Sequence, residues 1–504
     1  MSTEKDVAAS PKGRRRRVSR FALHPGWIVV AGSCALLVRA TVHSGLNTDV
    51  FWQLASGNWM LSHHAVIRAD VFSYTVRGHP WVSEEWGFQV LLAWMVRHIG
   101  NVSYWLVSGG ACVMALVASV VRWRRQGAGG LWTAALSIPT AVALFLGLAP
   151  RPQDLSYLLF ALELLLLTLS RRQRGWLIGL PLLFLLWSNL HGSFVLGLGV
   201  LVLELSLAAL VAIRAKVTAR AGLHEPLEGA RERRSHLQVS QPLRVLDASV
   251  LLVTCSLATL VNPHGVGLWS YVVRVTGASQ LNIIEEWQSP NFHSVIVLIA
   301  IALPALAAVA ILATGRVRTE LLDLVVWVGL FIATLHAIRF APYLAIAFGG
   351  LAAPWELGRR ETIHPTWLTW PASVAICLAL LAGGHLPAGT LEPGGVPIAA
   401  TDWLSHRSGR VFSTYAWNDY LISRDIPVFV DGRTDLYFGT GLLGTYVGVS
   451  QLTVAPDPVL RHWQVRWVLW PTHSALSNYL AEDPHWHLVH RFKTGEVFER
   501  IGAI

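Results

Sequence analysis

Long apolar runs that recur along almost the whole chain limit its possible folds more than any other feature. The runs at 178–186 and 295–312 are two examples. Only 14% of the 504 residues are charged and the mean hydropathy is +0.47, whereas about 25% of the residues of an average soluble protein are charged. These values exclude soluble, disordered and fibrous proteins, and they predict an α-helical polytopic membrane protein.

Eleven membrane spans are expected, and the apolar segment 87–98 is too short to be one, so we expect it at the outer interface. The spans are 26–46, 103–121, 131–149, 154–170, 176–189, 193–213, 246–262, 294–314, 319–336, 342–357 and 366–386. Basic clusters at 14–17, 122–125, 171–174 and 231–234 fall in gaps on one side, which hold 24 of the 40 Lys and Arg residues, whereas the opposite loops hold six. The positive-inside rule places this side in the cytoplasm. The same placement accounts for the net charge of +10 without a nucleic-acid partner.

The chain divides into a basic cytoplasmic N-terminus at 1–25, a transmembrane domain at 26–386 and a small extracytoplasmic α/β domain at 387–504. The transmembrane domain contains a first outer loop at 47–86 and a cytoplasmic linker at 214–245. In the last domain we expect strands at 411–412, 427–430, 466–470 and 487–490, and helices at 415–422 and 474–481. Each of the four cysteines falls inside an apolar run, which indicates neither a disulfide framework nor a metal cluster. Arginine outnumbers lysine by 36 to 4, as in GC-rich bacterial genomes, so we expect a multi-pass protein of a bacterial inner membrane.

Polar and ionisable residues collect on the expected outer side, where burying them is costly and their presence is therefore informative. They are Asp49, Glu84 and Glu85 of the first outer loop, and Arg151, Asn189, His191, His264, Glu285, Glu286 and Arg339 near the outer ends of spans, together with Trp52, Trp81 and Trp86. Their convergence on one face predicts a polar cavity at the outer leaflet.

Each charged candidate also has a structural interpretation. Asp49 is either a catalytic or metal-binding carboxylate or the N-cap of an interfacial helix. Glu84 and Glu85 would point about 100° apart on a helix, so we expect one of them to face the site; alternatively both belong to a solvated loop. Arg151 and Arg339 either hold a phosphate or extend to lipid headgroups.

The remaining candidates carry the same ambiguity. His191 and His264 lie in turns with Gly or Pro, where they bind a ligand or make structural hydrogen bonds. The tryptophans stack on sugars or anchor the protein at the interface. The segment 431–435 (DGRTD) reads as a turn closed by an Asp–Arg pair rather than as a metal or nucleotide-sugar site, because activated nucleotides are scarce outside the membrane.

Together these features resemble the GT-C superfamily of membrane glycosyltransferases, which includes protein O-mannosyltransferases and lipid A aminoarabinose transferases. The shared features are a basic inner N-terminus, an acidic residue just after the first span, about eleven spans and an outer soluble domain. At closer range the chain is similar to a bacterial group of membrane proteins described as GT-C-like. The segments that carry this similarity are DVFWQLASGNWMLSHH, FSYTVRGHPWVSEEW, WSNLHGSFVLG, VNPHG, EEWQSP and VFVDGRTDLY.

The resemblance implies transfer of a sugar from a polyprenyl-phosphate donor to a hydroxyl of a glycan, lipid or protein acceptor, among membrane lipids. Asp49 matches the first-loop acidic residue of the superfamily and is the expected base, with Glu84 or Glu85 as a second carboxylate. The remaining roles are donor phosphate binding by Arg151, Arg339 and His264, and sugar or acceptor binding by Trp52, Trp81, Trp86, Asn189, His191, Glu285 and Glu286. A divalent cation, Mg²⁺ or Mn²⁺, held by Asp49 and Glu85 is an alternative source of positive charge. A single displacement would invert the anomeric centre.

Two other functions fit the same pattern. A flippase or transporter for a lipid-linked sugar would use the outer cavity but would also need an inner access route, and the cytoplasmic loops offer few carboxylates or aromatic residues. A non-enzymatic assembly factor for cell-envelope glycans would use the outer α/β domain as a binding module. Loss of function on replacing Asp49 favours the enzyme, whereas function of the tail alone favours the binding module.

Overall fold

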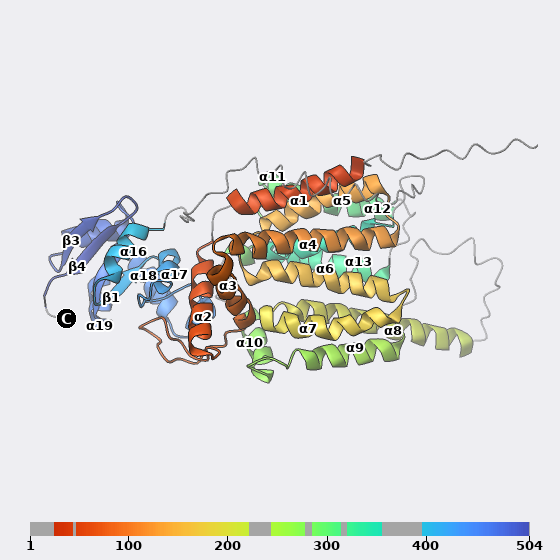
Figure 1. Cartoon of the computed structure of the whole chain (residues 1–504), viewed down its shortest axis with the longest axis horizontal. Helices are drawn as coiled ribbons and strands as arrows, with labels where there is room; N and C mark the ends of the chain where they lie inside the picture. The colour runs from red at the N-terminus through yellow and green to blue at the C-terminus, as the bar shows by residue number, and fades with distance from the viewer. Residues whose placement is uncertain are drawn as a thin grey trace, which may run out of the picture.

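The computed structural model describes residues 25–43, 47–220, 243–277, 285–313, 320–354 and 396–502. A bundle of apolar helices forms one half, a small α/β domain lies at one end of it, and α2 and α3 lie between the two (Figure 1). The basic segment 1–24, most of the linker 214–245 and the predicted span 366–386 lie outside the described residues.

Ten predicted spans coincide with apolar helices of the bundle. These are α1 (Pro25–His43), α4 (Val102–Gln126), α5 (Gly130–Leu146), α6 (Pro152–Ser170), α7 (Gly179–Leu190, after the 3-10 turn Arg174–Ile178), α8 (Phe194–Arg220), α9 (Val245–Ala258), the segment Val295–Ala313, α13 (Leu321–His336) and α14 (Ala341–Ala352, after the 3-10 turn Ile338–Phe340). Among the described residues, α4, α6, α8 and Val295–Ala313 are long and apolar enough to cross a membrane by length and composition. The other apolar stretches, including Gly26–Thr41 of α1, have 10–17 residues. The number of spans therefore stays a prediction.

Large apolar side chains cover the outside of the bundle. Leu36, Leu182 and Leu306 are 64%, 62% and 69% exposed, which water would penalise by about 25 cal/mol per Å² of apolar surface. Lipid tails remove that penalty, so these side chains are suited to face lipid.

Buried ion pairs join helices at the basic end of the bundle. Arg122 of α4 pairs with Asp323 of α13, and Arg171, just after α6, binds Glu204 of α8 through two nitrogens at 2.6 and 2.8 Å. A charge in such a setting is tolerated only when it is paired. These pairs therefore fix the order of the helices at the end opposite to the α/β domain.

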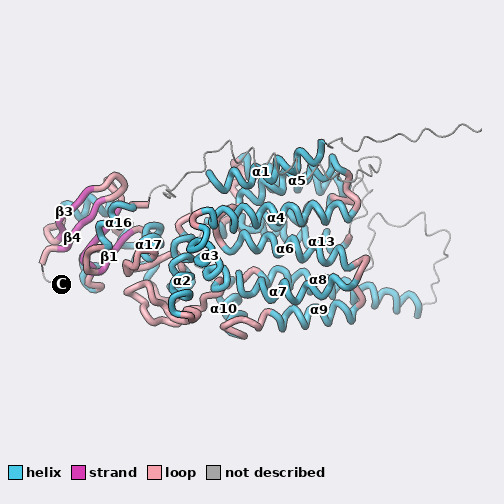
Figure 2. Tube along the Cα trace, viewed as in Figure 1, coloured by secondary structure: helices cyan, strands magenta, loops and turns pink. Residues whose placement is uncertain are grey.

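Two helices lie across the other end of the bundle (Figure 2). They are α2 (Asp49–His63) and α3 (Trp86–Ile99). Helix α3 covers the segment 87–98, which was expected at the outer interface. The two helices pack closely because Gly57 has no side chain: a Cβ there would lie 2.0 Å from the carbonyl oxygen of Gln89. The short helix α10 (Val266–Thr276) lies beside them. In the sequence it comes after α9 and before the segment Val295–Ala313.

The C-terminal domain has a four-stranded sheet in the order β1-β2-β4-β3. Its elements are α16 (Ile398–Ser405), β1 (Arg410–Ser413), α17 (Tyr415–Ile422), α18 (Leu442–Ser450), α19 (Pro456–His462), β2 (Val465–Trp470), α20 (Ala475–Glu482), β3 (Trp486–Arg491) and β4 (Glu496–Arg500). Strand β1 is parallel to β2, and the other two pairings are antiparallel. The two predicted helices are confirmed, and Thr414 and Ser474 cap them by accepting a backbone N–H.

Three of the four predicted strands are confirmed, and the strand at 427–430 is wrong. That segment makes only an isolated bridge between Val428 and Ser73 of the first outer loop. Its apolar residues are buried between the loop and the sheet, where the Phe429 ring contacts Tyr74 of the loop and Phe412 of β1. Strand β4, which pairs with β2 through Val497 and Phe498, was not predicted.

Candidate active site

The predicted polar residues meet where the bundle, the two crossing helices and the C-terminal domain come together. Asp49 is the first residue of α2, and the adjacent residue Thr48 holds the N-cap position. The N-cap interpretation of Asp49 is therefore wrong. Its Oδ2 instead accepts a hydrogen bond from Arg151 Nη1 at 3.2 Å.

Arg151 links two carboxylates from different parts of the chain. It precedes Pro152 at the start of α6, and it forms ion pairs with both Asp49 and Glu286. Glu286 belongs to the 3-10 turn Glu285–Trp287, in which the Glu285 side chain lies outside what the structure describes. Burial raises the pKa of Asp49, and the charge of Arg151 opposes that rise. The guanidinium thus lies among protein carboxylates rather than reaching toward headgroups.

Glu84 and Glu85 both line one small cavity, so the expectation that a single one faces the site is wrong. They lie in the turn before α3 and not on a helix, which removes the 100° separation. The cavity has a volume of about 90 Å³, and Trp52, Trp81 and Tyr271 also line it.

Glu85 has polar neighbours on both sides. Gln53 of α2 donates a hydrogen bond to its carboxylate, and His191 Nε2 lies 3.7 Å from Glu85 Oε1. Burial raises the pKa of Glu85 to about 7, although the Gln53 hydrogen bond opposes the rise. A carboxyl group with this pKa exchanges protons near neutral pH, as acid–base catalysis requires.

Asp435 of the C-terminal domain completes the carboxylate cluster and was not among the predicted site residues. Trp81 Nε1 donates a hydrogen bond to Asp435 Oδ2 at 3.1 Å, and the Tyr271 hydroxyl interacts with both Asp435 and Glu84. Burial raises the pKa of Glu84 well above its usual range, and the nearby charges of Glu85 and Asp435 raise it further. A Cβ at Gly192 would lie 2.3 Å from Glu84 Oε2, so a side chain there would displace the Glu84 carboxylate.

A second cavity, of about 150 Å³, extends from this cluster between bundle helices. Glu84 and Tyr271 line both cavities. The polar lining of the second cavity includes His191, Arg339 and Tyr343, and its apolar lining comes from Val195, Leu196, Val272, Val275 and Phe340. The lining of this cavity therefore combines the charge of Arg339 with apolar side chains from α8, α10 and the turn before α14.

Arg339 is the cation of this second cavity. Its guanidinium lies 4.3 Å from the centroid of the Trp287 ring. Among the described residues no carboxylate lies within ion-pair distance of it, although its charge lowers the pKa of Glu84 against the effect of burial. Arg339 is thus available to an anion in a way that Arg151 is not.

His191 is neutral in this site. Its Nδ1 lies 3.0 Å from Ser156 Oγ and 2.8 Å from Ser193 Oγ. Burial lowers the pKa of His191 to about 3, and the charges of Arg339 and Arg151 lower it further. A neutral imidazole offers hydrogen bonds but no positive charge to a phosphate.

Three other predicted residues make contacts at the edge of the site. Asn189 Oδ1 accepts from Trp86 Nε1 at 2.9 Å, while its amide nitrogen donates to two backbone carbonyls. His264 Nε2 lies 3.3 Å from the carbonyl oxygen of Ser83 and lines neither cavity. These contacts join α3, α7 and the loop after α9.

The described residues do not fit a protein-built metal site. No three His, Cys, Asp or Glu side chains in the described ranges are grouped as metal ligands. Asp49 and Glu85 are directed at Arg151 and Gln53, respectively.

A buried ion cluster attaches the C-terminal domain to the first outer loop. Arg433 binds Asp431 at 2.6 Å and Asp70 at 2.5 Å, and all three side chains are buried. The predicted turn closed by an Asp–Arg pair is thus confirmed. Beside it, a Cβ at Gly432 would lie 2.8 Å from the Trp52 ring, so the turn rests directly on α2. This docking brings Asp435 to the site.

No protein-family model and no curated protein matches the chain. Solved structures do match. The apo oligosaccharyltransferase of Archaeoglobus fulgidus has a TM-score of 0.50 and 12% identity, over 88% of this chain and 69% of its own. ArnT from Cupriavidus metallidurans, bound to undecaprenyl phosphate, scores 0.48 at 15% identity over 94% and 98% of the two chains. The arabinofuranosyltransferase AftD from Mycobacteria has a TM-score of 0.48 and 14% identity, over 96% of this chain and 40% of its own. All three are GT-C glycosyltransferases, and the match to the oligosaccharyltransferase, at a TM-score of 0.50, confirms the expected resemblance at the level of the fold alone.

Proposed function

We propose, on the premise that this chain has the fold of the GT-C glycosyltransferases, that it transfers a sugar from a polyprenyl-phosphate donor to an acceptor hydroxyl on the outer side of a bacterial inner membrane. One observation carries the proposal: a cavity lined by Arg339 and by apolar side chains of α8 and α10 adjoins a cluster of carboxylates. A lipid phosphate is complementary to this lining, because it joins an anionic group to an apolar chain.

The location of the site supports a lipid-linked donor. The site lies at the end of the bundle opposite the basic residues of α4 and the segment after α6 (Figure 1). The positive-inside rule assigns the basic end to the cytoplasm, so the site and the C-terminal domain face outward. Nucleotide sugars are cytoplasmic, and an outer site therefore needs a donor that the membrane itself carries.

The chemistry follows from the charges in the site. Asp49 takes the proton of the acceptor hydroxyl as its oxygen attacks the anomeric carbon, with Glu84 or Glu85 orienting the acceptor. The bond between that carbon and the phosphate oxygen breaks, and the phosphate leaves with the electron pair. Arg339, with Arg151 beside the base, stabilises the charge that develops on the phosphate. A single displacement of this kind inverts the anomeric centre.

Binding of undecaprenyl phosphate by the full-length protein in nanodiscs tests the donor site. Arg339→Gln should weaken binding by at least about tenfold, because a hydrogen bond to a charged group contributes about 1.5–3 kcal/mol. Arg97→Gln is the matched control, because Arg97 is exposed on α3 and binds only Asn58. Equal binding by the wild type and both variants would overturn the assignment of the donor phosphate to this cavity.

A further inference from the structure

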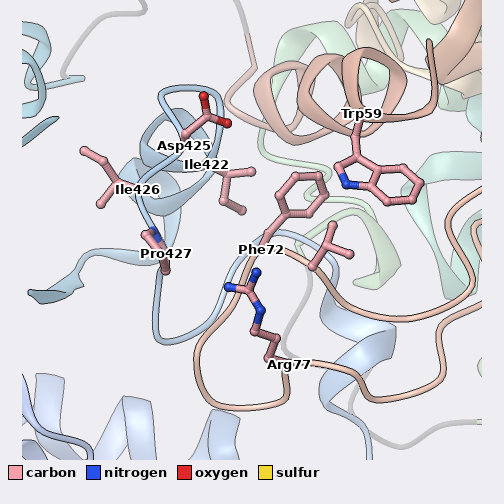
Figure 3. Close-up of a pocket in the computed structure, with 8 residues that line it drawn as sticks. Trp59, Phe72, Arg77, Ile422, Asp425, Ile426 and Pro427 are labelled. Carbon is pink, nitrogen blue, oxygen red and sulfur yellow. The ribbon is translucent and has the colours of Figure 1, made fainter. Parts of the chain in front are cut away.

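A groove separate from the candidate active site runs over the junction of α2, the first outer loop and the C-terminal domain. It consists of two adjoining hollows of about 300 and 700 Å³, which share Arg77, Asp425, Ile426 and Pro427. In the first hollow, Phe72 and Arg77 lie between Trp59 of α2 and the turn after α17 (Figure 3). None of the residues that line the groove comes from a bundle helix.

The groove is strongly cationic. Four arginines line it, and Asp425 is its one acidic lining residue. The arginines are Arg77, Arg407, Arg410 and Arg424. Only Arg424 among them is neutralised by a described carboxylate, that of Asp402. Four arginines against Asp402 and Asp425 therefore leave the groove with a net positive charge within the described ranges.

Two of these arginines, Arg407 and Arg410, are held in place by neutral partners. Arg407 lies 3.2 Å from the Trp403 ring centroid and donates to the Trp403 carbonyl oxygen at 2.6 Å. Arg410 lies 5.2 Å from the Tyr74 ring centroid and donates to a backbone carbonyl at 2.8 Å. Neutral partners of this kind position a guanidinium but do not neutralise its charge. The guanidinium can therefore still form a charge-assisted hydrogen bond with a bound anion.

We propose that this groove binds an anionic oligosaccharide, which serves as the acceptor of the transferred sugar; the acceptor role rests on the proposed function. The guanidinium groups match carboxylates or phosphates on the saccharide, and Trp59, Phe72 and Tyr74 offer aromatic surface to sugar rings. A membrane surface fits less well, because the lining comes from outside the bundle.

The distance between groove and site sets the size of the acceptor. Trp59 follows Asp49 by ten residues on the same helix, which corresponds to about 15 Å along its axis at 1.5 Å per residue. A saccharide that occupies the groove and also presents a hydroxyl to Asp49 must span this distance. The acceptor is therefore an oligosaccharide and not a single sugar.

Binding of defined saccharides to the full-length protein in nanodiscs tests this inference. The probes are tetragalacturonate and a heparin-derived tetrasaccharide, with neutral maltotetraose as reference. At least one anionic probe should bind about tenfold more tightly than maltotetraose, and Arg77→Gln combined with Arg407→Gln should remove at least about tenfold of that affinity. Arg461→Gln removes the same kind of charge from an exposed site on α19 outside the groove, and it should leave binding unchanged.

Two results would overturn the inference. One is equal binding of the neutral and the anionic saccharides, and the other is equal weakening by the groove variants and Arg461→Gln. Competition by vesicles of anionic phospholipid that abolishes saccharide binding would assign the groove to lipid instead. Asp49→Asn separates this inference from the proposed function, since it should abolish transfer and leave saccharide binding intact.

Discussion

The ion cluster around Arg433 makes a sharp prediction about how the C-terminal domain is held on the site. Arg433→Met removes a guanidinium that is 1% exposed and leaves the buried carboxylates of Asp431 and Asp70 without their cation. Breaking a buried pair in this way costs about 3–5 kcal/mol. The cation also lies 5.0 and 4.8 Å from the ring centroids of Phe72 and Trp81, contacts that the substitution weakens.

Thermal unfolding of the full-length protein in detergent measures this loss. For a domain of about 100 residues each kcal/mol lowers Tm by roughly 4–8 °C, so a loss near 3 kcal/mol corresponds to roughly 12 °C or more in the transition of the C-terminal domain. Arg466→Met is the matched control, because Arg466 pairs with Glu499 at 2.8 Å and the two side chains are 41% and 33% exposed. The exposed pair should contribute no more than about 1 kcal/mol. Equal Tm values for the two variants would refute the view that the buried cluster attaches the domain.

Three further predictions concern the carboxylate cluster. Burial raises the pKa of Glu85 from 4.5 to about 7. Between pH 4.5 and 7.5 the free energy of unfolding of the wild type should therefore fall relative to that of Glu85→Gln as the pH rises. Equilibrium unfolding should show a difference of up to about 3 kcal/mol. Gly192→Ala should reduce transfer because its Cβ would lie 2.3 Å from the Glu84 carboxylate, whereas Gly199→Ala, with open space around it, should not; equal rates would contradict the close fit. Trp81→Phe removes the N–H donated at 3.1 Å to a site carboxylate, and it should lower kcat/KM by about 1–2 kcal/mol of transition-state stabilisation while the fold persists.

Local sequence signals predicted the bundle well. Each of the ten apolar helices matches an apolar run, because the composition of a membrane-facing helix is a property of that segment alone. The segment 87–98 was recognised as apolar for the same reason, but it was expected only at the outer interface and not as the helix α3. The orientation of α2 and α3 across the end of the bundle was not predicted, since it depends on packing such as that of Gly57 on Gln89.

Contacts between distant segments explain what the sequence did not predict. Asp435 is 354 residues from Trp81 in the chain. The segment 431–435 was interpreted as a turn closed by the pair of Asp431 and Arg433, so Asp435 was not considered as a site residue. The arrangement of Glu84 and Glu85 was predicted wrongly because the helix begins only at Trp86. The strand prediction at 427–430 failed because the backbone there bridges only to the first outer loop, while Phe429 packs between that loop and β1.

Sugar transfer in proteoliposomes tests the central claim most directly. Wild type, Asp49→Asn and Asp247→Asn are each supplied with radiolabelled polyprenyl-phosphate sugars, and label in the acceptor fraction is counted. Asp247 is the control because it pairs with Arg174 at 3.5 Å at the basic end of the bundle. The account predicts transfer by the wild type and Asp247→Asn and its loss in Asp49→Asn, because the amide keeps the size of the side chain and removes its basicity. Transfer by Asp49→Asn at the wild-type rate would contradict the account.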